Sequence, residues 1–179
     1  MISWWRTSFG DGEVEKLRES VQKECIGQGL VTEEFEEEIS LALNVPFVVA
    51  TTNGSAALYM ALLSLGIGHG DEVIIPNRTW IASANAILLT GAKVVLVDVR
   101  SDLPLIDVVQ IQSKITTQTK ALMPVHLNGR SADMQEIQRL AEKFGIPIIE
   151  DACQAFFSSN FNGYLGTQSD VGCFSLGLT

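Results

Sequence analysis

The stretch DEVIIPNRTWIASANAILLTGAKVVLVDV, residues 71–99, places two short apolar runs on either side of a helical segment. The runs at 72–75 and 93–97 are rich in β-branched residues, and residues 80–89 between them have the composition of a helix. Apolar strands without polar alternation are typical of a parallel sheet that is covered on both faces. The stretch therefore predicts a strand-helix-strand unit of an α/β protein.

The same alternation extends over the rest of the chain from residue 45 onward. We expect further strands at 47–51, 120–125, 146–150 and 171–175, and helices at 55–65, 107–114 and 131–144. This pattern predicts an α/β fold with a doubly wound, mainly parallel sheet flanked by helices. Ligands of such sheets bind at the carboxyl ends of the strands, so the residues directly after each strand are the candidates for chemistry.

Residues 1–44 differ in composition and are predicted to form a separate N-terminal helical segment, with residues 45–179 as the ligand-binding domain. Charged amphipathic patterns predict helices at 12–24 and 32–43, separated by the glycines of GQG at 27–29. Thr32 is the expected N-cap of the second helix, and Glu34 and Glu36 fall in its first turn.

Composition excludes several classes of protein. Twelve basic and twenty-one acidic residues give a formal net charge of -9, which argues against a nucleic-acid partner. The three cysteines form no C-x-x-C pair and there are two histidines, so we expect reduced thiols and no metal site. We see no secretory leader and no apolar run of the roughly 18 residues that a membrane helix needs. These features predict a cytoplasmic protein without a membrane partner.

Two of the strand ends carry residues suited to binding a flat phosphorylated ligand. Asn53, Gly54, Ser55 and Ala56 open a helix, and the free amides of a first helical turn bind phosphate well. The alternative is that Ser55 only caps this helix. Trp80 follows the strand at 72–75 and can stack on a flat ring, although a core or interface tryptophan is the alternative.

Two further strand ends carry a carboxylate and a hydroxyl. Asp151 follows the buried run GIPII, where a carboxylate is costly without a partner. A protonated pyridine nitrogen would be such a partner, and its ring could then accept electrons from a substrate. The alternative is an aspartate that caps the next turn. Ser175 ends the last predicted strand and can donate to a phosphate, so the four ends together predict a pyridoxal-phosphate site.

Four motifs occur in order along the chain: GSAAL at 54–58, GDEVIIP at 70–76, VHLNG at 125–129 and EDACQ at 150–154. In this order they resemble the DegT/DnrJ/EryC1/StrS family of sugar aminotransferases, and the likeness begins at about Phe9. The resemblance implies the large domain of the aspartate-aminotransferase fold, which is fold type I of the pyridoxal-phosphate enzymes. It also implies transfer of an amino group, commonly from glutamate, to a keto-sugar linked to a nucleotide.

The resemblance assigns the phosphate of pyridoxal 5'-phosphate to four residues, which are Gly54, Ser55, Ala56 and Ser175. Trp80 would stack on the cofactor ring, Asp151 would be the catalytic carboxylate at the pyridine nitrogen, and Gln154 would contact the ring or its 3-hydroxyl. His126 and Asn128 belong to a family motif without an assigned chemical role, and we expect His126 to be an uncharged structural residue.

The resemblance also implies features outside these 179 residues. The lysine that joins the cofactor as a Schiff base is expected directly after Thr179, because Lys120 and Lys143 lie in other motifs. A further strand between those at 47–51 and 171–175, a small C-terminal domain and a second subunit are expected as well. We therefore interpret the sequence as part of an aminotransferase that forms a homodimer.

Three alternatives stay open at this point. A sugar dehydratase of the same family would carry a histidine in place of the lysine. A non-catalytic fragment would bind a phosphate ligand or a partner chain. A nucleotide-binding Rossmann domain is disfavoured because the sequence has no G-x-G-x-x-G motif.

Overall fold

A computed structural model describes residues 9–177 of the chain. These residues belong to two compact units, one ending at Ala50 and the other spanning Thr51–Gly177. None of the helices in residues 9–177 is long and apolar enough to cross a lipid bilayer.

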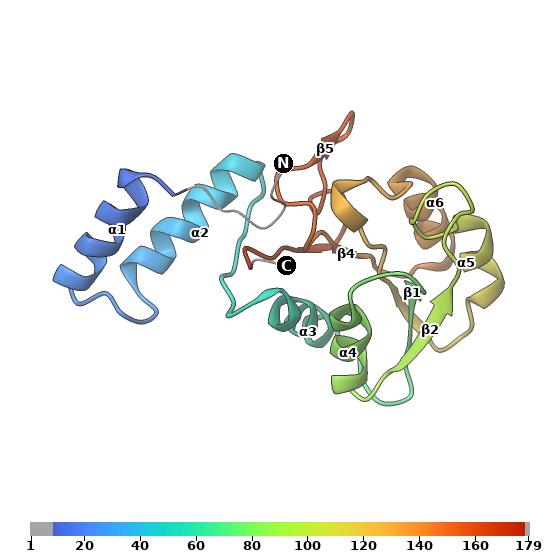
Figure 1. Ribbon diagram of the computed structural model, residues 1–179. Helices are drawn as coiled ribbons and strands as arrows, with labels where there is room; N and C mark the ends of the chain where they lie inside the picture. The colour runs from blue at the N-terminus through green and yellow to red at the C-terminus, as the bar shows by residue number, and fades with distance from the viewer. Residues whose placement is uncertain (1–8, 178–179) are drawn as a thin grey trace. The chain divides into compact units, whose positions relative to one another are not determined.

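The first unit contains two helices, α1 (Asp11–Gln22) and α2 (Leu30–Leu43), drawn in blue in Figure 1. At the start of α1, the Gly10 amide donates to the Glu13 carboxylate at 2.7 Å. The prediction that Thr32 caps the second helix is wrong. Gly29 is the N-cap, and the Thr32 amide already bonds to the Gly29 carbonyl at 2.9 Å, because the helix starts two residues earlier.

The strand predicted at 47–51 is absent, which corrects the sequence-based expectation. A strand forms only where a neighbour accepts and donates its backbone hydrogen bonds. No segment within residues 9–177 pairs with this one in that way. The Ala50 amide instead donates to the Glu36 carboxylate at 2.6 Å, so a side chain satisfies part of this backbone.

The second unit alternates strands and helices as predicted (Figure 1). Its helices are α3 (Gly54–Ser64), α4 (Ile81–Leu89), α5 (Val108–Lys114) and α6 (Met134–Phe144), with a short 3-10 turn at Leu127–Gly129. Its parallel strands are β1 (Glu72–Pro76), β2 (Lys93–Val97), β3 (Thr119–Leu122), β4 (Ile149–Asp151) and β7 (Val171–Cys173). A small hairpin of β5 (Ser159–Asn160) and β6 (Gly163–Tyr164) was not predicted.

The strands form a parallel sheet in two parts. One part has the order β2-β1-β3, and the other pairs β4 with β7. Isolated parallel bridges join Leu122 to Ile148 and Val125 to Asp151, so the β3 segment runs beside the β4 segment. The predicted α/β architecture, a mainly parallel sheet flanked by helices, is confirmed.

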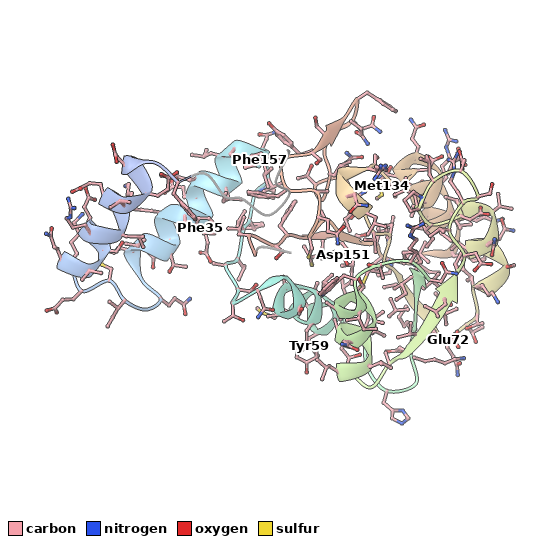
Figure 2. All side chains as sticks on the ribbon, viewed as in Figure 1. Phe35, Tyr59, Glu72, Met134, Asp151 and Phe157 are labelled. Atoms are coloured by element: carbon pink, nitrogen blue, oxygen red, sulfur yellow. The ribbon has the colours of Figure 1, made fainter. Side chains whose placement is uncertain are left out.

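Both faces of the sheet are covered, which explains its uniformly apolar strands. Val73 and Ile75 of β1 pack with α3 and α4, whereas Ile74 between them packs with α5 and α6. Successive side chains of a strand point to opposite faces, so one strand supplies both cores. In Figure 2, Tyr59 on α3 and Met134 on α6 lie on the two sides of this sheet.

Candidate active site

Three segments meet at the carboxyl end of the sheet around Gly54. A Cβ atom at Gly54 would lie 2.8 Å from Cys153 Sγ and 2.9 Å from Ser175 Cβ. The helix-opening turn, the residues after β4 and the residues after β7 are therefore in direct contact. Glycine is required at position 54 because a side chain would overlap these neighbours. Its backbone conformation is not the reason, since its φ lies outside the left-handed region.

The N-cap of α3 is Asn53, so the alternative in which Ser55 caps this helix is wrong. The Asn53 side-chain oxygen accepts from the Ala56 amide at 2.9 Å, and its carbonyl accepts from the Ala57 amide at 3.1 Å. Within residues 9–177, the amides of Gly54 and Ser55 make no hydrogen bond. Two donors that have no partner in the described residues thus lie at the positive end of the α3 dipole, which suits an anion.

Asp151 is held rigidly at the end of β4. Its backbone amide donates to the Pro124 carbonyl at 2.9 Å, and its own carbonyl accepts from the His126 amide at 3.0 Å. The side chain is buried, and Figure 2 labels its position. Its Oδ2 accepts from the Ser83 hydroxyl at 2.6 Å, and its Oδ1 accepts from the Cys153 backbone amide at 3.2 Å. A carboxylate has about four acceptor positions, so further donors can still bind to it.

The backbone of Trp80 approaches Ser83, the residue that donates to this carboxylate. Trp80 is the N-cap of α4, its carbonyl lies 3.2 Å from the Ser83 hydroxyl, and 61% of its surface is exposed. Ser83 itself was not predicted. The sequence signal was weak, because the helix IASANAILL carries both Ser83 and Asn85, and only Ser83 lies on the buried face, where a hydroxyl requires a hydrogen-bond partner.

Gln154 is oriented by the turn that contains Asn128. The Gln154 side-chain oxygen accepts from the Asn128 amide at 3.0 Å, and Asn128 adopts a left-handed conformation with φ of 55°. This hydrogen bond leaves the side-chain nitrogen of Gln154 as its remaining donor. The Gln154 side chain is thus held in one orientation, three residues after Asp151 in the sequence. Its contact with a cofactor stays a prediction.

His126 and Glu150 form a buried pair beside the site. Nδ1 of His126 accepts from the Ala132 amide at 3.1 Å, which leaves Nε2–H to donate to Glu150 at 2.8 Å. This tautomer fits the expectation of an uncharged structural histidine. Glu150 also accepts from the Gly166 amide, at 2.9 Å, and from the Gln168 amide, at 2.7 Å. Burial acts to raise the Glu150 pKa, but these donors outweigh it and hold the pKa below its ordinary value.

The two thiols next to the site are held toward their neutral form. Burial and then the negative charge of Asp151 raise the pKa of Cys153, and the same causes raise the pKa of Cys173 to about 12. Since the thiolate is the reactive form, both cysteines remain neutral near pH 7. Lys120 and Lys143 lie away from this edge, one on β3 at its amino end and one in the last turn of α6.

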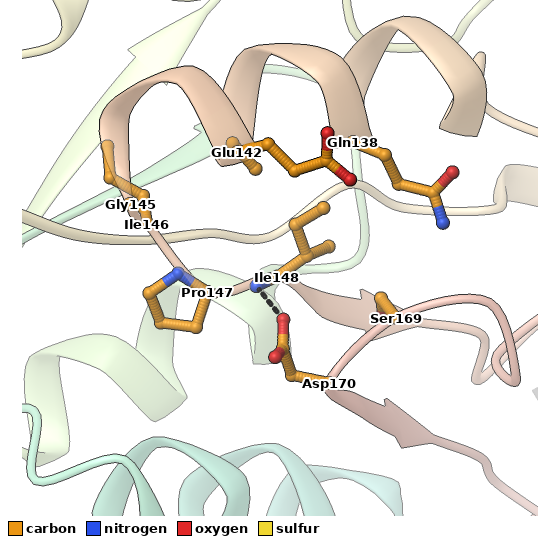
Figure 3. A pocket seen from close by; sticks show the side chains of 9 residues that line it. Gln138, Glu142, Gly145, Ile146, Pro147, Ile148, Ser169 and Asp170 are labelled. Carbon is orange, nitrogen blue, oxygen red and sulfur yellow. Dashed lines mark hydrogen bonds between the residues drawn. The ribbon is translucent and has the colours of Figure 1, made fainter.

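A hollow of about 600 Å³ exists elsewhere in the second unit (Figure 3). It lies beside the C-terminal end of α6, where the Ile148 amide donates to Asp170 at 2.9 Å. Ile148 precedes β4 and Asp170 precedes β7, so the hollow is at the amino ends of these strands. Ligands of parallel sheets bind at the carboxyl ends, and we therefore place the candidate site at Gly54 and Asp151.

The sequence and the fold are similar to those of known proteins. Residues 8–177 match the model of the DegT/DnrJ/EryC1/StrS aminotransferase family. The chain belongs to this family. A GDP-perosamine synthase of Escherichia coli O157:H7 is 39% identical over 175 residues, which cover 97% of this chain and 48% of that protein.

Solved structures show the same relationship. A putative sugar aminotransferase of Streptococcus pneumoniae, Spr1654 in its PMP-form, matches with a TM-score of 0.95 at 28% identity, covering 99% of this chain and 48% of that one. The aminotransferase TlmJ of Streptoalloteichus hindustanus matches with a TM-score of 0.93 at 30% identity, covering 100% and 49%. The chain thus spans about half the length of the family members that it matches.

Proposed function

We propose that this chain is the cofactor-binding part of a pyridoxal-phosphate-dependent aminotransferase that acts on a keto-sugar linked to a nucleotide. The observation that carries the proposal is the contact of the Gly54 turn with Cys153 and Ser175. Cys153 stands two residues after Asp151, whose carboxylate is buried. Family membership and the solved PLP-form and PMP-form of the S. pneumoniae protein support the choice of cofactor.

The donors and acceptors at this edge fit such a cofactor. A phosphate needs several donors, and the free amides of Gly54 and Ser55 and the hydroxyl of Ser175 supply them. The Ala56 amide is already bonded to Asn53, so its predicted phosphate contact would compete with that cap. A protonated ring nitrogen needs a buried carboxylate with an open acceptor position, which Asp151 provides.

Six of the seven predicted residues then have a task, and Ala56 is the exception because its amide is bonded to Asn53. Gly54, Ser55 and Ser175 would bind the phosphate, and Trp80 would stack on the ring. Gln154 would donate from its side-chain nitrogen, and Asp151 would keep the proton on the ring nitrogen. When bound, the cofactor supplies an electron sink for the bond changes at the amino-bearing carbon. The two neutral thiols add no competing charge near the phosphate.

The substrate class rests on the relatives. The GDP-perosamine synthase name indicates a nucleotide-linked sugar, and the S. pneumoniae protein is described as a sugar aminotransferase. We extend this class to the present chain, with glutamate as the amino donor, a homodimer as the assembly and the cytoplasm as the location. The net charge of -9 also favours a protein that does not bind nucleic acid.

Replacing Asp151 by asparagine in the full-length protein tests the proposal. The shape of the side chain is kept, but the ring nitrogen loses its anionic partner, so turnover should fall by about 100-fold or more. The matched control is Asp170→Asn, which changes a carboxylate at the opposite end of the same strands. Amino transfer is followed with glutamate and a nucleotide-linked keto-sugar. Equal turnover in the two variants would refute the role of Asp151.

A further inference from the structure

The Ser83 hydroxyl lies between the tryptophan segment and the buried carboxylate. Ser83 has no exposed surface, and its hydroxyl oxygen is 2.6 Å from Oδ2 of Asp151, 68 residues away in sequence. The other buried positions of α4 are Ala86 and Ile87, so Ser83 is the single polar side chain on the buried face of this helix. None of the roles described above uses this hydroxyl.

The direction of the hydrogen bonds follows from the number of hydrogens. The one hydrogen of Ser83 has two acceptors in reach, Oδ2 of Asp151 at 2.6 Å and the Trp80 carbonyl at 3.2 Å, and the shorter contact to the carboxylate takes it. The Thr79 hydroxyl lies 2.9 Å from the Ser83 oxygen and must therefore donate to it. The result is a directed chain from Thr79 through Ser83 to Asp151. Its last step has the short distance of a hydrogen bond to an ionised acceptor.

This chain completes the support of the Asp151 side chain. The backbone of Asp151 is bonded on both sides, but that leaves the carboxylate free to turn about its side-chain bonds. Ser83 holds Oδ2, and the Cys153 amide holds Oδ1. Without Ser83, one oxygen of a buried carboxylate would lose its side-chain donor, which disfavours the negative charge.

We infer that Ser83 is a positioning residue that fixes Asp151 and stabilises its charge, so that the proton stays on the ring nitrogen of the cofactor. The inference rests on the proposed function. If the carboxylate is less stable as an anion, the proton moves from the ring nitrogen toward Asp151, and the pair becomes neutral. Ser83 therefore acts on the cofactor through Asp151 and not by contact.

The test uses the full-length protein loaded with pyridoxal phosphate labelled with ¹⁵N in its ring. In the unchanged protein, the ring nitrogen should resonate at the position of a protonated pyridine. In Ser83→Ala, the resonance should move toward the unprotonated position, and the cofactor should dissociate about tenfold more readily. Ser83→Thr keeps the hydroxyl and should restore both readouts.

The matched control is Thr90→Ala, which removes a hydroxyl from the other end of α4, where it bonds to the Ile87 carbonyl at 2.7 Å. This variant should leave the resonance unchanged even if it lowers the melting temperature. If Ser83→Ala does not fold, Thr79→Val removes the donor to Ser83 and should move the resonance in the same direction by a smaller amount.

An unchanged resonance in cofactor-loaded Ser83→Ala, or in Thr79→Val if the first variant does not fold, would overturn the inference and leave the proposed function intact. An unchanged protein that retains no labelled cofactor would overturn the proposed function and the inference with it. Failure of the inference is therefore seen in the variant protein, and failure of the proposed function is seen in the unchanged protein.

Discussion

The contact at Gly54 predicts the effect of adding a single methyl group. Ordinary contacts of a Cβ atom begin near 3.4 Å, and an alanine here would approach Cys153 Sγ at 2.8 Å and Ser175 Cβ at 2.9 Å. At least one segment must therefore move by about half an ångström. Both neighbours lie in a packed part of the site, where such overpacking typically costs about 1–3 kcal/mol.

The helix propensity gained by replacing glycine with alanine is smaller than this steric cost. Alanine is favoured over glycine inside a helix by at most about 1 kcal/mol, and less at the first position of α3. The steric term wins, and we expect Gly54→Ala to lose about 1 kcal/mol of unfolding free energy. Because the moving turn also carries the free amides, cofactor affinity should fall by about tenfold, which corresponds to about 1.4 kcal/mol.

Urea unfolding and cofactor titration of the full-length protein measure these two effects. Gly68→Ala is the matched control, since its nearest neighbour is the Thr90 carbonyl at 3.7 Å and its φ is outside the left-handed region. It should stay within about 0.5 kcal/mol of the unchanged protein. Adding Cys153→Ala to Gly54→Ala should recover about half of the loss, because the Ser175 contact remains. A Gly54→Ala protein that is as stable and binds cofactor as tightly as the original would refute the reasoning.

Two other predictions concern the groups beside the site. Glu150→Gln replaces one acceptor oxygen by an NH₂ group, which would face buried donors. The variant should therefore lose about 3 kcal/mol of stability near pH 7. The Glu150 pKa is lowered by folding, so its contribution is present above the ordinary value of 4.5 and is lost as the pH falls through the folded-state value. Acid titration of stability should therefore be flatter in the variant, and equal acid limbs would contradict this role. Iodoacetamide at pH 8 should modify Cys25 first and Cys153 and Cys173 only on unfolding, because burial and Asp151 raise the pKa of the latter two. Mass mapping that finds fast modification of Cys153 would show that its thiol is accessible and ionised.

The main sheet of the second unit was predictable because most of its strands lie in apolar runs that alternate with helix signals, whereas the β5–β6 hairpin has no such run. The run VVLV at 94–97 and the helix after Asp107 both appear close to their predicted bounds. The segment at 47–51 has equally strong strand composition but forms none, since composition cannot show whether a neighbouring strand is present. The prediction that Thr32 caps the second helix failed for a local reason, because glycine also serves as an N-cap.

The sequence predicts that Gly54, Asp151 and Ser175 meet at one edge, because each follows a predicted strand. The structure places the Gly54 turn against Ser175, although no strand forms at 47–51, and the binding of a cofactor by these residues stays a prediction. Asn53 and Ser83 were missed because their roles depend on the direction of a side chain within a turn or helix, which strand order does not define. Three donors to Glu150 were missed as well, since the amides of Gly166 and Gln168 and the hydroxyl of Ser169 come from a loop further along the chain.

The neighbouring carboxylates of β4 point to opposite faces of the sheet. Ile149 belongs to the core beside α3 and α4, so Asp151 shares that face, and Glu150 points to the other with Ile148. A one-residue slip of this strand would turn Glu150 to the face of Ser83 and Asp151 to the opposite face, away from their present partners. Exchanging the two residues would keep composition and net charge, yet leave both carboxylates at the wrong length for their partners. The strand register is thus encoded by side-chain length, and insertions or deletions within β4 should be far less tolerated than in the hairpin of β5 and β6.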